Sequence, residues 1–64
     1  MKTVQELLSK IKANCTGYLY NDSDIQVIYQ NLCKLYGSEC IHDGYDPFLT
    51  DCIQYEVELF FNNN

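Results

Sequence analysis

Apolar residues near the N-terminus recur with the spacing of one helix face. Counted from Val4, they follow at offsets of 3, 4, 7 and 11, at Leu7, Leu8, Ile11 and Cys15. Thr3 and Glu6 occupy the two positions of a capping box, in which the threonine side chain caps the helix and the glutamate reaches back. The pattern therefore predicts a helix over residues 4–14.

A second apolar stripe lies in the middle of the chain. Its members fall at offsets of 0, 3, 7, 10 and 11, at Ile25, Ile28, Leu32, Leu35 and Tyr36. Ser23 and Gln26 form another capping-box candidate, and Gly37 stands where a glycine commonly follows a helix. We expect a helix over residues 24–36 that packs antiparallel on the first one through these stripes.

Two polar stretches connect the apolar segments. Residues 16–23 contain Gly17, which suits a helix C-terminal turn, and end in residues typical of turns and caps. Residues 37–46 are expected to form a loop, in which Cys40 and Ile41 are the strongly apolar members that turn inward.

The C-terminal segment fits two structures. Asp46 as N-cap and Pro47 as first helical residue favour a helix, on whose wheel only Glu56 lies on the wrong side. Apolar and polar positions also alternate as in a strand, which would need a partner strand. We favour the helix. The predicted fold is mainly α, a small three-helix bundle with helices at about 4–14, 24–36 and 47–61; the alternative is an α+β fold with two helices and a strand at about 52–60.

Length and composition exclude several classes of function. The 64 residues are 47% hydrophobic, which predicts one small domain over residues 1–64 and excludes a two-domain enzyme. The chain lacks a run of about 18 apolar residues, so no membrane span is expected. With four lysines and no arginine, direct binding of nucleic acid is not expected. The N-terminal lysines and the missing apolar stretch argue against a secretory signal and predict a cytoplasmic protein.

Charge is divided unevenly along the chain. Residues 1–34 hold four lysines and three acids, a sum of +1, whereas residues 35–64 hold six acids and no lysine, a sum of −6. A one-signed half suits docking on a basic surface, although an acidic surface also serves solubility alone. Tyrosine is common at interfaces, and Tyr45 lies among these acids. The predicted partner-binding residues are Glu39, Asp43, Tyr45, Asp46, Asp51 and Glu58.

The four cysteines stand at positions 15, 33, 40 and 52. In a reducing compartment we expect free thiols, with Cys15 and Cys52 buried on apolar faces; disulfides or a metal site are the alternatives. Weak candidates for a zinc site are Cys33, Cys40, His42 and Cys52, because three thiols and one imidazole could complete a tetrahedron. No Cys-x₂-Cys motif supports that site, so no metal or other cofactor is predicted.

Other chemistry is poorly supported. Cys40, His42 and Asp43 are close in sequence, but so small a domain is not expected to enclose a pocket of about 300 Å³ or more that excludes water. The acid pairs Asp22/Asp24 and Asp43/Asp46 lack the remaining features of a calcium loop. The protein is therefore not expected to be an enzyme.

In size, acidity and absence of catalytic motifs, the chain resembles in general character the small inhibitors that bacteriophages encode against host nucleases and defence systems, such as anti-CRISPR and anti-restriction proteins. The resemblance implies an inhibitor that acts in the host cytoplasm on a protein with a basic surface, such as a groove that otherwise holds nucleic acid. Two alternatives remain: a structural or regulatory homo-oligomer, such as a homodimer, and a small metal- or ligand-binding module.

Overall fold

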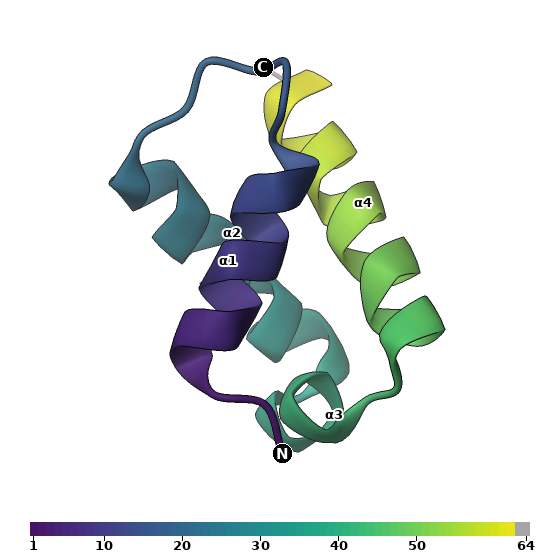
Figure 1. The fold of residues 1–64 in the computed structure, drawn as a ribbon. Coiled ribbons are helices and arrows are strands. Elements are labelled where there is room, and N and C mark those ends of the chain that lie inside the picture. The colour runs from purple at the N-terminus through teal and green to yellow at the C-terminus, as the bar shows by residue number, and fades with distance from the viewer. Residues whose placement is uncertain (63–64) are drawn as a thin grey trace.

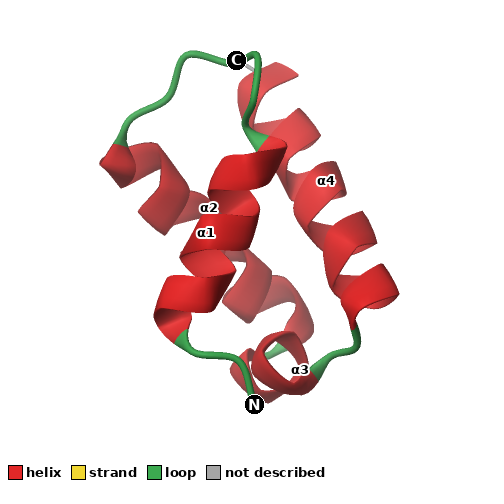
Figure 2. Ribbon diagram, viewed as in Figure 1, coloured by secondary structure: helices red, strands yellow, loops and turns green. Residues whose placement is uncertain are grey.

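The computed structural model describes residues 1–62, and it is helical throughout. Between the helices run loops and turns, and this part of the chain contains no strand (Figure 2). The expected mainly α class is confirmed, and the alternative strand at 52–60 is wrong because a helix covers that stretch. The elements are α1 (Val4–Asn14), α2 (Asp22–Tyr36), α3 (Ser38–Asp43) and α4 (Asp46–Asn62).

The first helix begins and ends as predicted. The Thr3 side chain caps α1, accepting a hydrogen bond from the backbone N–H of Glu6 at 3.2 Å. The buried residues of α1 are Leu7, Leu8 and Ile11, but Val4 at the outer end of the stripe is 44% exposed. The apolar spacing thus identified the helix, while its first member lies beyond the core.

The second helix begins two residues earlier than expected. Asn21, not Ser23, is the N-cap of α2: its side chain accepts from the N–H of Asp24 at 3.0 Å, and the Asp24 carboxylate accepts from the N–H of Asn21 at 3.1 Å. Asparagine caps as well as serine does, and here it completes a reciprocal pair. At the other end, Gly37 adopts a φ of +87°, which favours glycine.

A short helix stands where a loop was predicted. α3 takes up most of residues 37–46, so the bundle has four helices within the described chain rather than three. Ile41 enters the core with no exposed surface, as expected, whereas Cys40 points outward and is exposed. A helix of six residues is too short to display a hydrophobic period, which is why the sequence did not show it.

The helices pack around one core (Figure 1). α2 passes behind α1, α4 runs beside α1, and α3 closes the end of the molecule at which the N-terminus lies. Gly44 allows the tight passage from α3 to α4, because a Cβ there would stand 2.7 Å from the Cys40 carbonyl oxygen. All four helices contribute to the core, which consists of Leu7, Leu8, Ile11, Cys15, Ile25, Ile28, Leu32, Ile41, Leu49, Cys52, Ile53 and Val57.

Leu35 lies on the opposite side of α2 from the one expected. Leu35 was assigned to the α1–α2 contact, but it is 64% exposed. The next residue, Tyr36, packs instead, with its ring edge-on to that of Phe48 at 5.9 Å. The helix wheel placed Glu56 on the apolar side of α4, and the structure agrees: Glu56 is buried, with 6% of its surface exposed.

Candidate functional site

The six residues predicted to bind a partner all lie on the surface of α3, α4 and their junction. Glu39 and Asp43 are four residues apart on α3, a spacing that places them on one face. The other four lie at the α3–α4 junction and on α4, at Tyr45, Asp46, Asp51 and Glu58. Each of the six is exposed, and Tyr45 retains 71% of its surface.

The outer face of α4 carries a second exposed tyrosine that the sequence analysis did not single out. Tyr55 is 57% exposed and lies four residues after Asp51 and three before Glu58. In a helix these three side chains share one face, spread over about 10 Å of its axis. A helix wheel of this segment already places Tyr55 beside the two acids, but in the alternative strand Tyr55 would lie on the other side from Glu58.

Asp46 differs from the other acids because its charge is compensated within the chain. Its carboxylate lies 3.3 Å from the Lys2 ammonium and 3.7 Å from that of Lys10. The hydrogen bond from Lys2, and then the charge of Lys10, hold the pKa of Asp46 below its ordinary value. Two lysines of the N-terminal half therefore neutralise one acid of the acid-rich half. The negative electrostatic field around α3 and α4 comes mainly from the other carboxylates there.

Four exposed carboxylates of α3 and α4 have no ion pair within the described residues. Among residues 1–62, the ion pairs engage Lys2, Lys10 and Lys12, and the carboxylates in them are those of Asp22 and Asp46. Within the same residues no ion pair reaches the exposed acids of α3 and of the outer face of α4. We call these four carboxylates with the two exposed tyrosines the acidic surface; it consists of Glu39, Asp43, Tyr45, Asp51, Tyr55 and Glu58.

His42, a weak candidate for a metal ligand, lies at a junction of hydrogen bonds. Its Nδ1 is 2.6 Å from the backbone oxygen of Lys2, and because a carbonyl oxygen only accepts, Nδ1 carries the hydrogen. Nε2 lies 2.8 Å from the Tyr29 hydroxyl, and in the tautomer that carries its hydrogen on Nδ1 it accepts from that hydroxyl. The N–H of Lys2 also donates to the backbone oxygen of His42 at 2.8 Å. Both ring nitrogens thus join the N-terminal segment to α2 and α3.

The remaining metal candidates are dispersed. Cys52 is buried in α4, Cys40 is exposed on α3 and Cys33 is half-buried on α2. Within the described residues no group of three or more His, Cys, Asp or Glu side chains is arranged to hold a metal ion. The prediction that Cys15 and Cys52 are buried core residues is confirmed. All four cysteines are free thiols in the structure.

One buried thiol and two half-buried tyrosine hydroxyls have pKa values above their ordinary ones. Burial, and then the nearby charge of Asp24, raises the pKa of the Cys15 thiol. Burial, followed by a hydrogen bond with Cys33, raises the pKa of Tyr29. Burial is also the main cause for Tyr36, whose neighbours include Cys52 and Glu56. These groups are held neutral inside the protein and offer no reactive anion.

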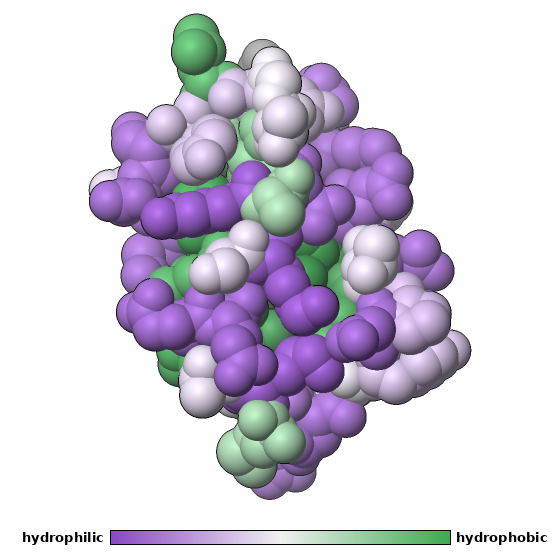
Figure 3. Space-filling model, in the orientation of Figure 1, coloured by the Kyte–Doolittle hydropathy of each residue, from purple (hydrophilic) through white to green (hydrophobic). Residues whose placement is uncertain are grey.

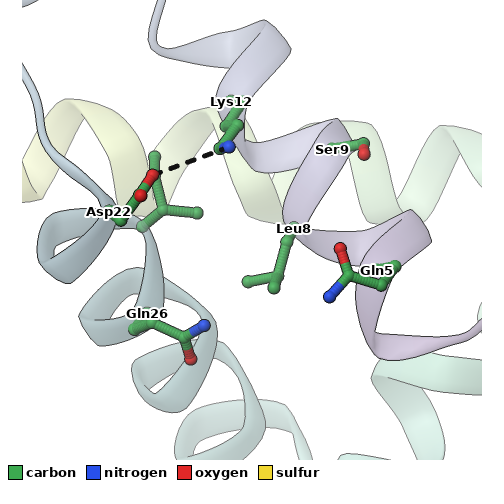
Figure 4. A pocket seen from close by; sticks show the side chains of 7 residues that line it. Gln5, Leu8, Ser9, Lys12, Asp22 and Gln26 are labelled. Carbon is green, nitrogen blue, oxygen red and sulfur yellow. Dashed lines mark ion pairs between the residues drawn. The ribbon is translucent and has the colours of Figure 1, made fainter.

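A small groove separates α1 from α2 (Figure 4). It has a volume of about 230 Å³, and its lining includes the apolar side chains of Leu8 and Ile25 and the polar side chains of Gln5 and Gln26. An ion pair of 3.6 Å between Lys12 and Asp22 bridges it. Ligand pockets usually measure about 300–1,000 Å³, and the two charges compensate each other. The groove is therefore a weaker candidate than the acidic surface.

Comparisons with known proteins identify no relative. No protein-family model matches the chain, and neither a curated protein nor a solved structure matches it. Among the described residues, no helix combines the length and the apolar character that crossing a membrane requires.

Proposed function

We propose that this chain is a small non-enzymatic protein that docks its acidic surface on a basic surface of another protein and thereby inhibits that protein. One observation carries the proposal. Four carboxylates without an ion pair among residues 1–62, at positions 39, 43, 51 and 58, are exposed on α3 and α4, and two tyrosines of the same part of the chain are 71% and 57% exposed.

The arrangement suits a protein partner with exposed lysines and arginines. A surface whose charges are all negative accelerates association with a basic partner and repels acidic ones. It repels the phosphates of nucleic acid, so the proposed partner is a protein and not DNA or RNA. The rings of Tyr45 and Tyr55 add large, rigid contact surfaces, of the kind enriched at the centres of interfaces.

Inhibition follows from the chemistry of the partner's surface. A basic groove on a nuclease or a defence protein normally holds nucleic acid through phosphate contacts. A helix that presents carboxylates on one face competes for the same lysines and arginines. This mode of action would place the protein with the small phage-encoded inhibitors that act in the host cytoplasm, which the chain resembles in size and acidity.

The proposal is tested by matched charge reversals. The protein is immobilised, partners are captured from a bacterial lysate, and the captured partner is then titrated by calorimetry at about 0.1 M and about 1 M salt, between which the Debye length falls from about 10 to about 3 Å. Asp51→Lys should weaken binding at least about tenfold, because it places a like charge against a basic surface. Glu6→Lys is the control: it makes the same change of charge at an exposed position on α1.

The two salt concentrations separate docking through charge from other modes. We expect affinity to fall at high salt for the wild-type protein and less so for Asp51→Lys. Equal losses in Asp51→Lys and Glu6→Lys, or binding that ignores salt, would contradict the proposal. Tyr55→Ala should weaken binding at both salt concentrations, because its contribution is contact area and not charge.

A further inference from the structure

Among residues 1–62, Glu56 is the one charged residue that the fold buries, with 6% of its surface exposed. It lies four residues after Cys52 and four before Phe60, on the face of α4 that turns toward the core. Within the same residues, neither a hydrogen bond nor an ion pair engages its carboxylate. Buried carboxylates are normally paired, because the loss of water is otherwise uncompensated.

The carboxylate of Glu56 nevertheless meets solvent at its tip. No fully buried side-chain nitrogen or oxygen among residues 1–62 lacks a hydrogen-bond partner. Since neither oxygen of Glu56 has such a partner, both oxygens touch the surface. The side chain is therefore packed along its stem and open at its end, where a ligand can reach both oxygens at once.

The open end lies where α2 and α4 pack together, beside Tyr36. Burial, then Cys52, and then the charges of Glu56 and Tyr55 raise the pKa of the Tyr36 hydroxyl, so these groups lie near it. Tyr36 is half-buried, whereas Tyr55 is 57% exposed and belongs to the acidic surface. The buried carboxylate thus adjoins the surface proposed to dock on a basic partner, with two tyrosines close by.

A guanidinium group is the ligand that suits this arrangement. Its planar fork donates two parallel hydrogen bonds to the two oxygens of one carboxylate. It is more weakly hydrated than the ammonium group of lysine, and it stacks on aromatic rings. Among residues 1–62, no lysine supplies the missing charge: Lys2, Lys10 and Lys12 pair with other acids, and Lys34 forms no ion pair.

We propose that Glu56 is the anchor of the docking site: one arginine side chain of the basic partner inserts between α2 and α4 and donates two hydrogen bonds to the buried carboxylate. This inference rests on the proposed function and adds the contact that holds the partner in place. The exposed acids attract a basic surface over a distance, but water screens each of them. A carboxylate that has already lost most of its water pairs more strongly.

The same residue should lower the stability of the free protein, because an unpaired buried charge is unfavourable until a partner supplies the cation. Glu56→Gln keeps the shape of the side chain and removes the charge. In thermal unfolding followed by circular dichroism, it should raise the Tm of the free protein by about 4 °C or more. In calorimetry with the captured partner, it should weaken binding at least about tenfold. Glu6→Gln is the matched control, because it makes the same change at an exposed position on α1 and should leave both values near those of the wild type.

A titration without the partner keeps the anchor separable from the proposed function. N-acetyl-arginine amide is added to isotope-labelled protein at about 1–100 mM, the range of a weak contact, and the backbone amide shifts are recorded by NMR. N-acetyl-citrulline amide has nearly the same shape without the charge and serves as the control ligand. We expect saturable shifts at Tyr36, Cys52 and Glu56 with the arginine compound, and none with the citrulline compound or in Glu56→Gln.

Saturable shifts confined to these residues, together with a higher Tm in Glu56→Gln, would support the anchor. Shifts that do not saturate by about 100 mM, or that Glu56→Gln retains, would overturn it and leave a carboxylate that is only hydrated. A captured partner that binds Glu56→Gln as tightly as the wild type would overturn it as well. Failure to capture any partner would count against the proposed function, while the titration and the Tm still decide whether Glu56 binds a guanidinium group.

Discussion

Replacing His42 by alanine should destabilise the protein, although the residue lies in the shortest helix. Its ring bonds to the Lys2 carbonyl at 2.6 Å and to the Tyr29 hydroxyl at 2.8 Å. These contacts span 40 and 13 residues of sequence, so they link parts of the chain that no local interaction holds together. Alanine keeps the helix propensity of α3 and removes only the ring.

The size of the effect follows from the two hydrogen bonds. One intramolecular hydrogen bond contributes about 0.5–1.5 kcal/mol, and a partner left half-buried without one adds to the loss. We therefore expect His42→Ala to lower the free energy of unfolding by about 1–3 kcal/mol. Domains of this length have free energies of unfolding of roughly 3–10 kcal/mol, so the change is large. It corresponds to a fall in Tm of about 5–20 °C.

Urea and thermal unfolding followed by circular dichroism measure this loss. Tyr29→Phe removes one hydroxyl and should cost about 0.5–1.5 kcal/mol, and the double variant should lose less than the sum of the two single losses. Glu39→Ala is the control, because Glu39 is exposed in the same short helix. A His42→Ala variant as stable as Glu39→Ala, or strict additivity with Tyr29→Phe, would refute the structural role of the ring.

Further predictions concern the core, the ion pairs and the thiols. Leu32→Ala should cost about 2–5 kcal/mol in urea unfolding, whereas Leu35→Ala should change the free energy of unfolding by less than about 0.5 kcal/mol, because Leu32 is 1% exposed and Leu35 is 64% exposed. The lysines lower the pKa of Asp46 from 3.8, so its contribution is present above that pH and is lost as the pH falls through the lowered pKa. The stability difference between wild type and Asp46→Asn should therefore shrink as the pH falls through the lowered pKa of Asp46, and a difference that does not change with pH in this acid range would contradict this. In alkylation followed by mass spectrometry, the exposed thiol of Cys40 should react first, and the buried thiol of Cys15, whose pKa is raised, should react only on unfolding.

The sequence determined the long helices well and the short one poorly. Amphipathic stripes and the cap at Thr3 located α1 to the residue, because local spacing and capping suffice for a helix of this length. α3 has no side-chain cap and a single buried residue, Ile41. The helix is held by long-range contacts such as the hydrogen bonds between Lys2 and His42. Such contacts join distant positions and produce no periodic pattern in the sequence.

The candidate site shows the same division. Counting charges identified the acid-rich half correctly, and the exposure of the predicted acids is as expected. Counting could not show that Lys2 and Lys10 would reach Asp46, because that contact depends on how α1 and α4 pack.

The hydropathy of the surface is uneven. The side seen in Figure 3 is mostly hydrophilic, with an isolated apolar group at the end where the α1–α2 loop lies.

The choice between helix and strand at the C-terminus decides which tyrosine a partner can meet. A strand would have turned Glu56 outward and placed Tyr55 on the same side as Ile53 and Val57. The helix instead buries Ile53 and Val57 to 1% exposure, and full burial of such a side chain is worth about 1.5–3 kcal/mol. It accepts Glu56 at 6% exposure in return, and no fully buried side-chain nitrogen or oxygen among residues 1–62 lacks a hydrogen-bond partner. The geometry that buries Glu56 is therefore also the one that exposes Tyr55 between two carboxylates of the acidic surface.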